Sequence, residues 1–276
     1  MRLYISADIE GIAGVVSTAQ TLEDGFEYER ACRWMTEEVL AACRGAMDAG
    51  VTEVVVSDSH GNGQNLLLDL LPDGVELIRH WPRPWAMMQG IEHGTYDMAM
   101  LIGHHGGAQH HPATLAHTFA GRMITQVRVN NAVASETTVN AAIAANFGVP
   151  VVLASGDQAY VQHVKELLPD VLTVVTKEAH GRYSARTRTP AAVCRELTEK
   201  AGEAAAAVSS GRSFRPFMLE EPVTLEIDFQ QHAVPELLEL LPQVERNHAL
   251  GIHFEARSVE ELSRFLSFVI ALGPLQ

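Results

Sequence analysis

The sequence predicts an α/β fold: a mostly parallel sheet covered by helices, with a smaller α+β unit at the C-terminal end. Three observations carry this prediction. Short apolar runs alternate with segments of helical periodicity in the first part of the chain, and strands separated by helices pair in parallel. Several of these runs end in polar residues, as strands do at a ligand-binding edge. The pattern then changes after "SSGRSFRPFMLEEP".

The first strand and the first helix are clearly marked. The apolar run over residues 3–9 predicts a buried strand. Residues 27–49 place apolar side chains such as Met35, Val39 and Ala46 at helical spacing, and Gly50 marks the end of that helix.

The later elements continue the alternation. Further strands are expected in "VTEVVVSDSH", ending near Ser57, in "DMAMLIGHH", ending near Gly103, and in "VPVVLASGD" and "VLTVVTKE". Helices are expected over residues 137–147, in "QAYVQHVKELLPD" and over the alanine-rich residues 190–209. The pair Asn130-Asn131 predicts a hairpin turn.

The composition shift divides the chain. We place an α/β domain at residues 1–212 and a smaller α+β domain at residues 213–276. The second domain is expected to contain strands and helices in the order 222–229, 233–241, 249–256 and 258–271.

Charge and cysteine content exclude several classes of protein. Acidic residues outnumber basic ones by 34 to 20, giving a net charge of −14, which argues against nucleic acid and anionic membranes as partners. No apolar run reaches the ~20 residues that a membrane span needs.

The three cysteines are scattered, and no leader is expected before the first strand. A reducing cytoplasm is therefore the expected location.

Polar side chains follow three of the predicted strands. Asp8 and Glu10 end the first, His60 follows the second, and His104 and His105 end the third. Because Asp8 and Glu10 lie two apart, they point to the same face and repel each other unless a cation lies between them. Carboxylates and imidazoles suit a divalent transition metal, zinc above all, with manganese or cobalt as alternatives. The sequence therefore predicts a metal site.

Further histidines and carboxylates stand close to these residues in the chain. Of 13 histidines, five fall between residues 104 and 117. His110 and His111, before a proline in a polar loop, are expected to be exposed, and His117 is either a core histidine or a functional one. Glu136 precedes a helix and is either a ligand or a carboxylate favoured by the helix dipole.

Two details of the second strand end have competing interpretations. Asp58 can be a ligand or a capping residue, but we expect it to accept the second N–H of His60, as carboxylates beside metal-bound histidines do. The glycines of "SHGNGQNL" could cradle phosphate, but Leu66 stands where a dinucleotide fingerprint has its third glycine. We therefore expect the glycines to turn the loop beside His60.

Taken in order, these motifs resemble a known family. "SADIEGIAG", "SDSH" at 57–60, Gly-x-His at 103–105, the isolated His117 and "SETTVN" at 135–140 resemble the D-aminopeptidase family of zinc peptidases, the DppA type. "MTEEVLAA" and "VPVVLASGD" also fit. The resemblance covers most of residues 1–180 and is vaguer beyond. It implies an α/β domain joined to a smaller α+β domain, and a ring-built decamer with an enclosed chamber.

The resemblance also implies roles for individual residues. Asp8 would bridge two zinc ions, with Glu10 and His60 completing one site. Glu136 and the histidine at the end of the third strand would complete the other site. His117 would be the catalytic residue beside the metals.

The chain departs from the family pattern in three places, one of which is Ser135 before Glu136, where the family more often has glycine. The family has Gly-Tyr-His where this chain has Gly103-His104-His105, so matching the glycine makes His105 the ligand, whereas a slip of one residue would make it His104. The loop from His105 to His117 is also slightly longer than in the family. Because that loop lies near the active centre, preference for D- or L-residues stays open.

Together, these observations predict a metal-dependent aminopeptidase that acts on short peptides. Two divalent cations, most simply Zn²⁺, would activate a hydroxide and polarise the peptide carbonyl. The alternatives are a dipeptide- or metal-binding protein that serves peptide transport without turnover, and another two-metal amidohydrolase. A homo-oligomer is expected from the resemblance.

Overall fold

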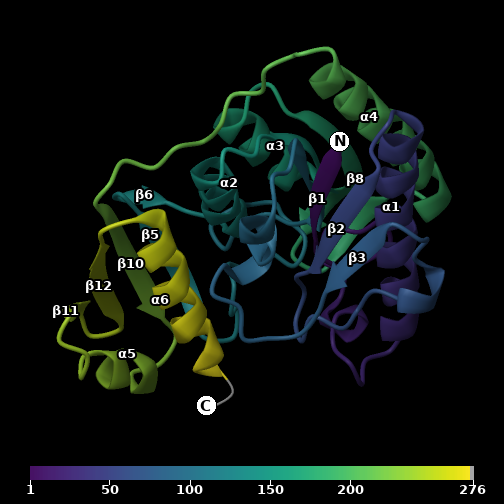
Figure 1. Cartoon of the computed structure of the whole chain (residues 1–276). Helices are drawn as coiled ribbons and strands as arrows, with labels where there is room; N and C mark the ends of the chain where they lie inside the picture. The colour runs from purple at the N-terminus through teal and green to yellow at the C-terminus, as the bar shows by residue number, and fades with distance from the viewer. Residues whose placement is uncertain (274–276) are drawn as a thin grey trace.

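A seven-stranded sheet forms the larger part of the computed structural model, which describes residues 1–273 (Figure 1). Its strands lie in the order β3 (Val75–Ile78), β2 (Glu53–Asp58), β1 (Arg2–Ala7), β4 (Met98–His104), β7 (Val151–Asp157), β8 (Leu172–Gly181) and β9 (Ser184–Thr187). Every neighbouring pair is parallel except β8 with β9. The predicted α/β class is confirmed.

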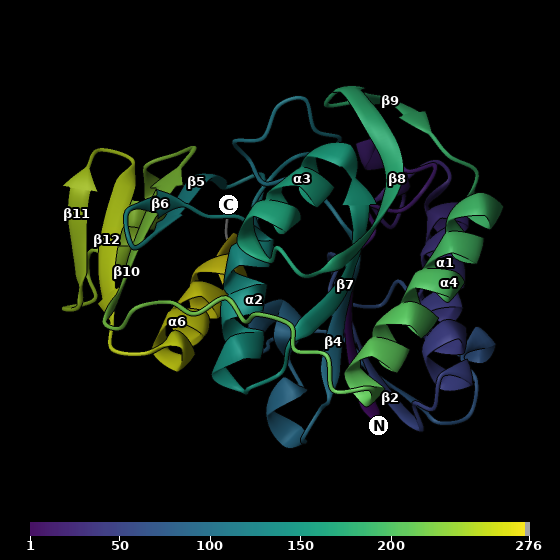
Figure 2. The ribbon, with the colours of Figure 1, turned by 90° about the horizontal axis from the view of Figure 1, so that it is seen from above.

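Helices cover both faces of this sheet, as Figure 2 shows. On one face, α1 (Tyr28–Asp48) and α4 (Pro190–Ser209) pack against each other. On the other face lie α2 (Glu136–Asn146) and α3 (Gln158–Leu167). Adjacent strand residues point to opposite faces, so Leu3 joins the core under α1 and α4, while Tyr4 joins the core with α2 and α3.

The predicted helices and the apolar strands are present close to their expected bounds. The first strand stops at Ala7, so Asp8 and Glu10 lie in the loop that follows it. The short strands β3 and β9, and β11 (Val244–His248) of the second sheet, were not predicted, because each is short and mostly partly buried or exposed. Short 3₁₀ turns occupy the connections, at η1 (Thr18–Gln20), η2 (Leu68–Leu70), η3 (Ala86–Met88) and η4 (Ile91–His93).

A second, antiparallel sheet of five strands lies beside the first. Its order is β11 (Val244–His248), β12 (Gly251–Ala256), β10 (Val223–Phe229), β5 (Ile124–Val129) and β6 (Ala132–Val133), and α5 (Ala233–Leu238) lies at its end. The predicted Asn130-Asn131 turn joins β5 to β6, with φ of 49° and 66°. The sheet thus takes two strands from residues 124–133, and the domain boundary at residue 212 stays a prediction.

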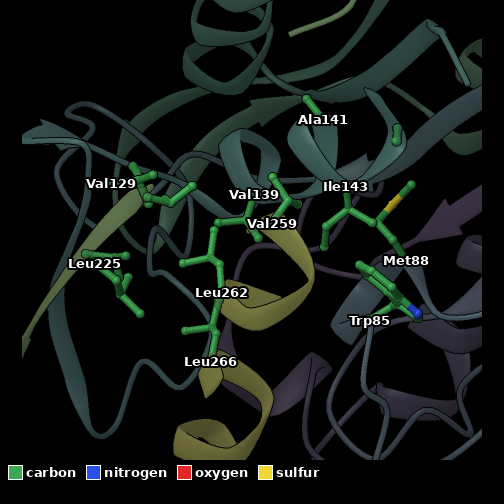
Figure 3. Close-up of a cluster of buried hydrophobic side chains, with 14 of the residues drawn as sticks. Trp85, Met88, Val129, Val139, Ala141, Ile143, Leu225, Val259, Leu262 and Leu266 are labelled. Carbon is green, nitrogen blue, oxygen red and sulfur yellow. The ribbon is translucent and has the colours of Figure 1, made fainter. Parts of the chain in front are cut away.

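Helix α6 (Val259–Ala271) joins the two sheets. It lies between the small sheet and α2, as Figure 2 shows. Its buried side chains Leu262 and Leu266 belong to the same core as Val139 of α2 (Figure 3). The Ser263 hydroxyl donates to the carbonyl oxygen of Pro84 at 2.9 Å. Helix α6 is therefore fixed both to α2 and to the loop before η3.

Within residues 1–273, no helix is long and apolar enough to cross a bilayer.

Candidate active site

The candidate residues meet where the strand order of the large sheet reverses. From β1 the chain moves outward through β2 to β3, and then returns to the other side of β1 as β4. The carboxyl ends of β2, β1 and β4 therefore lie side by side, because all three strands are parallel. Ligands collect at such a switch point in open α/β sheets. The loops there carry Asp8, His60 and His105.

Five side chains, all buried except the partly buried His60, form one continuous cluster at this edge. His60 Nδ1 lies 2.9 Å from Glu10 Oε2 and 3.3 Å from Asp8 Oδ1. His105 Nε2 lies 3.4 Å from both Asp8 Oδ2 and Glu136 Oε2. Asp8 is thus in the middle, with one carboxylate oxygen facing each histidine. The structure brings all five predicted ligand positions together.

The loop after β1 can reach this position because it passes very close to β4. Gly11 donates its N–H to the carbonyl oxygen of Gly103 at 2.7 Å. A Cβ at position 11 would collide with the carbonyl oxygen of His104. The glycine that follows Glu10 is therefore required by the close backbone approach.

Each histidine is oriented by a backbone carbonyl on its far side. His60 Nε2 lies 2.8 Å from the carbonyl oxygen of Thr21, and His105 Nδ1 lies 2.9 Å from that of Gly106. A carbonyl oxygen only accepts hydrogen bonds, so these nitrogens carry the hydrogen in a neutral ring. Metal-binding histidines are arranged in this way, with the other nitrogen turned toward the ion and its carboxylate ligands.

The charges in the cluster shift the pKa values strongly. Burial disfavours every charged form, yet the charge of His60 holds the pKa of Glu10 well below its usual range. Glu136 and His105 shift each other in the same way, despite their burial. The charge of His105 lowers the pKa of Glu136 to about 2, and the charge of Glu136 raises the pKa of His105 to about 10. Burial and then the charge of Glu10 raise the pKa of Asp8. Asp8 is thus the carboxylate whose negative charge is least offset by the neighbouring histidines.

This donor set fits divalent transition metals. Asp8, Glu10 and His105 each offer one ligand atom, and these atoms lie within 4.8 Å of one another. The ligand atoms of His105, His117 and Glu136 also lie within 4.8 Å of one another. Among the described residues, buried His105 Nε2 has no hydrogen-bond partner. Carboxylate oxygens and imidazole nitrogens at this spacing suit zinc, and also manganese or cobalt.

His117 lies at the edge of the cluster. Its ring stacks on that of His105, with centroids 4.2 Å apart, and its Nε2 is 3.9 Å from Glu136 Oε1. Nδ1 lies 2.9 Å from the Leu115 carbonyl oxygen, which leaves Nε2 as the basic nitrogen. The side chain is 21% exposed, unlike the buried cluster. Leu115 and Phe119 on either side have positive φ, 53° and 60°, a conformation that costs free energy for such residues.

The two adjacent strand-end histidines have different surroundings. The His104 ring is fully buried, stacks on Tyr160 with centroids 5.9 Å apart, and places Nε2 3.2 Å from the Ser6 carbonyl oxygen. Its ligand atom can also lie within 4.8 Å of Asp8 and Glu136. Only His105, however, contacts both of these carboxylates at 3.4 Å. The geometry therefore favours His105.

Two expectations about neighbouring residues were wrong. Asp58 does not hold the His60 ring, since its carboxylate accepts the N–H groups of Asn65 and Leu66 and thereby closes the loop after β2. The Thr21 carbonyl takes its place at the ring. His111 is exposed as expected, but His110 is only partly exposed, because its Nδ1 accepts the N–H of Gly107 at 2.9 Å.

A buried lysine that the sequence analysis missed supports the loop after β1. Lys177 of β8 donates to the carbonyl oxygens of Glu10, Ile12 and Val15 at 2.5, 2.8 and 2.7 Å. Glu38 accepts the N–H of Ala13 at 2.9 Å. Burial raises the pKa of Glu38 to about 8 and lowers that of Lys177 to about 8. A lysine that ends the apolar run "VLTVVTKE" was the available signal.

A cavity of about 610 Å³ opens above the cluster. Its floor includes Asp8, His60, His117 and Glu136. Its wall is mainly apolar and comes from the loop before η3, from Phe119 and from the end of α6, with Trp81, Pro82, Ile270 and Ala271. Pockets of this size and character hold small ligands.

Comparison with known proteins identifies the family of the chain. The sequence model of a family described as "D-aminopeptidase" matches residues 1–268. The chain belongs to the D-aminopeptidase family. The match reaches well beyond residue 180, where the motifs alone became vague, and it confirms the resemblance seen in the sequence.

Individual relatives of this family are similar over nearly the whole chain. A D-aminopeptidase from Bacillus subtilis (strain 168) is 31% identical over 265 residues, which cover 95% of this chain and 93% of the relative. A solved structure, described as the Zn-dependent D-aminopeptidase DppA from Bacillus subtilis, a self-compartmentalizing protease, has a TM-score of 0.92 and 27% identity. The likeness covers 100% of this chain and 99% of that one. This D-aminopeptidase family member therefore shares the fold of a zinc-dependent relative.

Proposed function

We propose that the chain is a zinc-dependent aminopeptidase that removes the N-terminal D-residue from short peptides. The observation that carries this proposal is the buried cluster centred on Asp8, in a chain that belongs to the D-aminopeptidase family. The support is chemical. Three carboxylates lie together with two oriented imidazoles, and burying that much negative charge is unfavourable unless a cation is bound.

The ligand roles follow from the contacts. Glu10 and His60 would hold one ion, His105 and Glu136 would hold a second, and Asp8, which contacts both histidines, would contribute to both. When bound, a pair of zinc ions supplies an activated water and polarises the scissile carbonyl. The carbonyls behind His60 and His105 keep both rings in the orientation that this requires.

His117 is the residue that would handle the proton. Its Nδ1 hydrogen is held by the Leu115 carbonyl, so Nε2 is free to take a proton and then give it to the departing amine. Nε2 faces the cavity beside Glu136 without being part of the five-residue contact chain. A binding protein without turnover would not need this free nitrogen.

The assembly is proposed from the relative and from the family resemblance, and the location from the sparse cysteines. The neighbouring structure is described as self-compartmentalizing. We extend this to a homo-oligomer of this chain, specifically a ring-built decamer in the cytoplasm that acts on short peptides. Light scattering tests the assembly, and a mass near the 30.1 kDa of one chain would contradict it.

The activity is tested with aminoacyl p-nitroanilides. Protein stripped by a chelator is reloaded with Zn²⁺, Mn²⁺ or Co²⁺, its metal content is measured, and release from D-alanyl, L-alanyl and glycyl substrates is followed. We expect about two metal ions per chain, activity only after reloading, and the D-alanyl substrate to be preferred. Fully loaded protein that releases nothing from any of them would contradict the proposal, and would leave binding without turnover or another amide as the substrate.

A further inference from the structure

The cavity above the metal-ligand cluster has two unlike faces. The floor is polar and carries Asp8, His60, His117 and Glu136. The same cavity is also lined by the apolar groups of Trp81, Pro82, Phe119, Ile270 and Ala271, which we call the apolar wall. A hydrolase needs the floor for the peptide bond, so the apolar wall is left to contact another part of the substrate.

The apolar wall is held at a fixed position relative to the floor. Ile270 and Ala271 belong to the last turn of α6, whose Leu262 and Leu266 pack beside Val139 of α2 (Figure 3). Helix α2 begins at Glu136, so the packing that places the wall also places a residue of the floor. The distance from the reacting carbonyl to the wall is therefore set by the core.

The other part of the wall is fixed to the same helix. Trp81 and Pro82 precede Pro84, whose carbonyl oxygen accepts the Ser263 hydroxyl of α6 at 2.9 Å. Trp81 itself donates its indole N–H to the Gly61 carbonyl oxygen at 2.8 Å. The ring thus presents its apolar surface with its polar atom already satisfied.

The wall offers no free charge to a ligand. Arg83 is the one arginine or lysine among the described residues that line the cavity, and it is only 2% exposed. Each of its three nitrogens donates within the protein, to His80, Ser57 and Ile78. An acidic side chain would therefore find no available cation here, and a basic one would lose its hydration against apolar groups.

We propose that the apolar wall is the subsite for the side chain of the N-terminal residue, and that Ile270 sets the size it accepts. This inference rests on the proposed aminopeptidase function. The enzyme then favours substrates with a large aliphatic or aromatic N-terminal side chain over alanine, and rejects acidic and basic ones. One methylene in an apolar pocket changes kcat/KM by ~10–200-fold, so the difference between D-leucine and D-alanine is measurable.

The experiment compares metal-loaded enzyme on D-alanyl, D-leucyl, D-phenylalanyl, D-glutamyl and D-lysyl p-nitroanilides. We expect kcat/KM for D-leucyl to exceed that for D-alanyl by ~10-fold or more, and the charged substrates to be poorest. Ile270→Ala should lower D-leucyl kcat/KM by ~10-fold and leave D-alanyl within about twofold. Ile270→Phe should narrow the subsite and shift the preference toward D-alanyl.

The matched control is Phe268→Ala on the same helix. Phe268 is 47% exposed and does not line the cavity, so its removal should leave the whole substrate profile unchanged. The metal content of every variant is measured beside its kinetics. A second readout is calorimetric binding of free D-leucine and D-alanine, which should differ in the wild type and become equal in Ile270→Ala.

The outcomes separate this inference from the function on which it rests. Equal kcat/KM for D-alanyl and D-leucyl, or a preference for D-glutamyl or D-lysyl, overturns the subsite and leaves the aminopeptidase intact. So does a Phe268→Ala profile that changes as much as that of Ile270→Ala. No release from any substrate by metal-loaded wild-type enzyme overturns the proposed function.

Discussion

The floor and the apolar wall of the cavity are built on different physical principles. The floor, together with Glu10 and His105 beneath it, consists of ionisable side chains from the loops after β1, β2 and β4 and from the start of α2, most of them buried, and their charges shift one another's pKa values. The wall consists of apolar side chains from α6, from Phe119 and from the loop before η3, of which Phe119 and Ile270 pack against the core.

This difference indicates where the effects of substitutions depend on one another and where they add independently. Charges in a buried cluster interact strongly, so removing one floor residue changes what the others bind. The free energy of an apolar contact depends mainly on the area that it buries. Each wall substitution should therefore change substrate selectivity independently of the others. Chemistry therefore resides in the floor, and selectivity can vary in the wall without damage to it.

The largest effect is expected for the shared carboxylate. Asp8→Ala should reduce metal affinity by more than ~10²-fold, the upper range seen for residues that only support ligands, and reduce activity to background. Glu10→Ala should lose less metal, because Glu10 contacts only His60 whereas Asp8 contacts both histidines. Elemental analysis of both variants checks this, and equal loss would remove the bridging role from Asp8.

The next effect separates chemistry from metal binding within the floor. His117→Ala should keep its metal and its fold but lower kcat by ~10²-fold or more, because it removes the free nitrogen that handles the proton. His105→Ala, the matched variant, should lose both metal and rate. Metal content and kcat are measured for both. If His117→Ala also loses its metal, His117 is a ligand and the roles must be reassigned.

A smaller effect is expected for the support beneath the floor. Lys177→Met leaves three buried carbonyl oxygens without their donor, at ~1–3 kcal/mol each, and frees the loop that carries Glu10. We expect a metal affinity lowered by ~10-fold and a lower urea midpoint. The exposed Lys165→Met is the control. Unchanged metal affinity in Lys177→Met would mean that the loop holds its shape without the lysine.

The smallest effect is expected in the wall. Ser263→Ala removes one hydrogen bond to Pro84 and should cost about 1 kcal/mol of unfolding free energy. It should raise KM modestly and leave kcat and metal content unchanged, because no charge of the floor is touched. Urea unfolding and steady-state kinetics check this. A fall in kcat comparable to that of His117→Ala would break the distinction between floor and wall.

The sequence was most informative about the floor. Asp8, Glu10 and His60 interrupt or follow apolar runs, and this local contrast places them at strand ends. The parallel pairing of β1 with β2 and β4, also predictable from the alternation, then brings those ends together. His117 and Glu136 carried a weaker signal, and the family resemblance was needed to single them out.

The sequence was least informative about contacts between distant segments. Ile270 reaches the cavity only because α6 packs on α2, more than a hundred residues earlier in the chain. The small sheet likewise pairs β10 with β5, which no local pattern indicated. Asp58 was misassigned for the same reason, because its partners depend on how the following loop closes.

By itself, then, the sequence determined the α/β class and most of the chemistry-bearing side chains. Residue type and short-range periodicity encode both, since burial on a strand or helix face repeats every few residues. Tertiary structure alone decided which nitrogen of each histidine faces the carboxylates, because the carbonyls of Thr21, Gly106 and Leu115 fix the rings. It also placed His105 rather than His104 against both carboxylates, and it formed the apolar wall. Backbone carbonyls are identical in every residue, so only their position in space gives them a role.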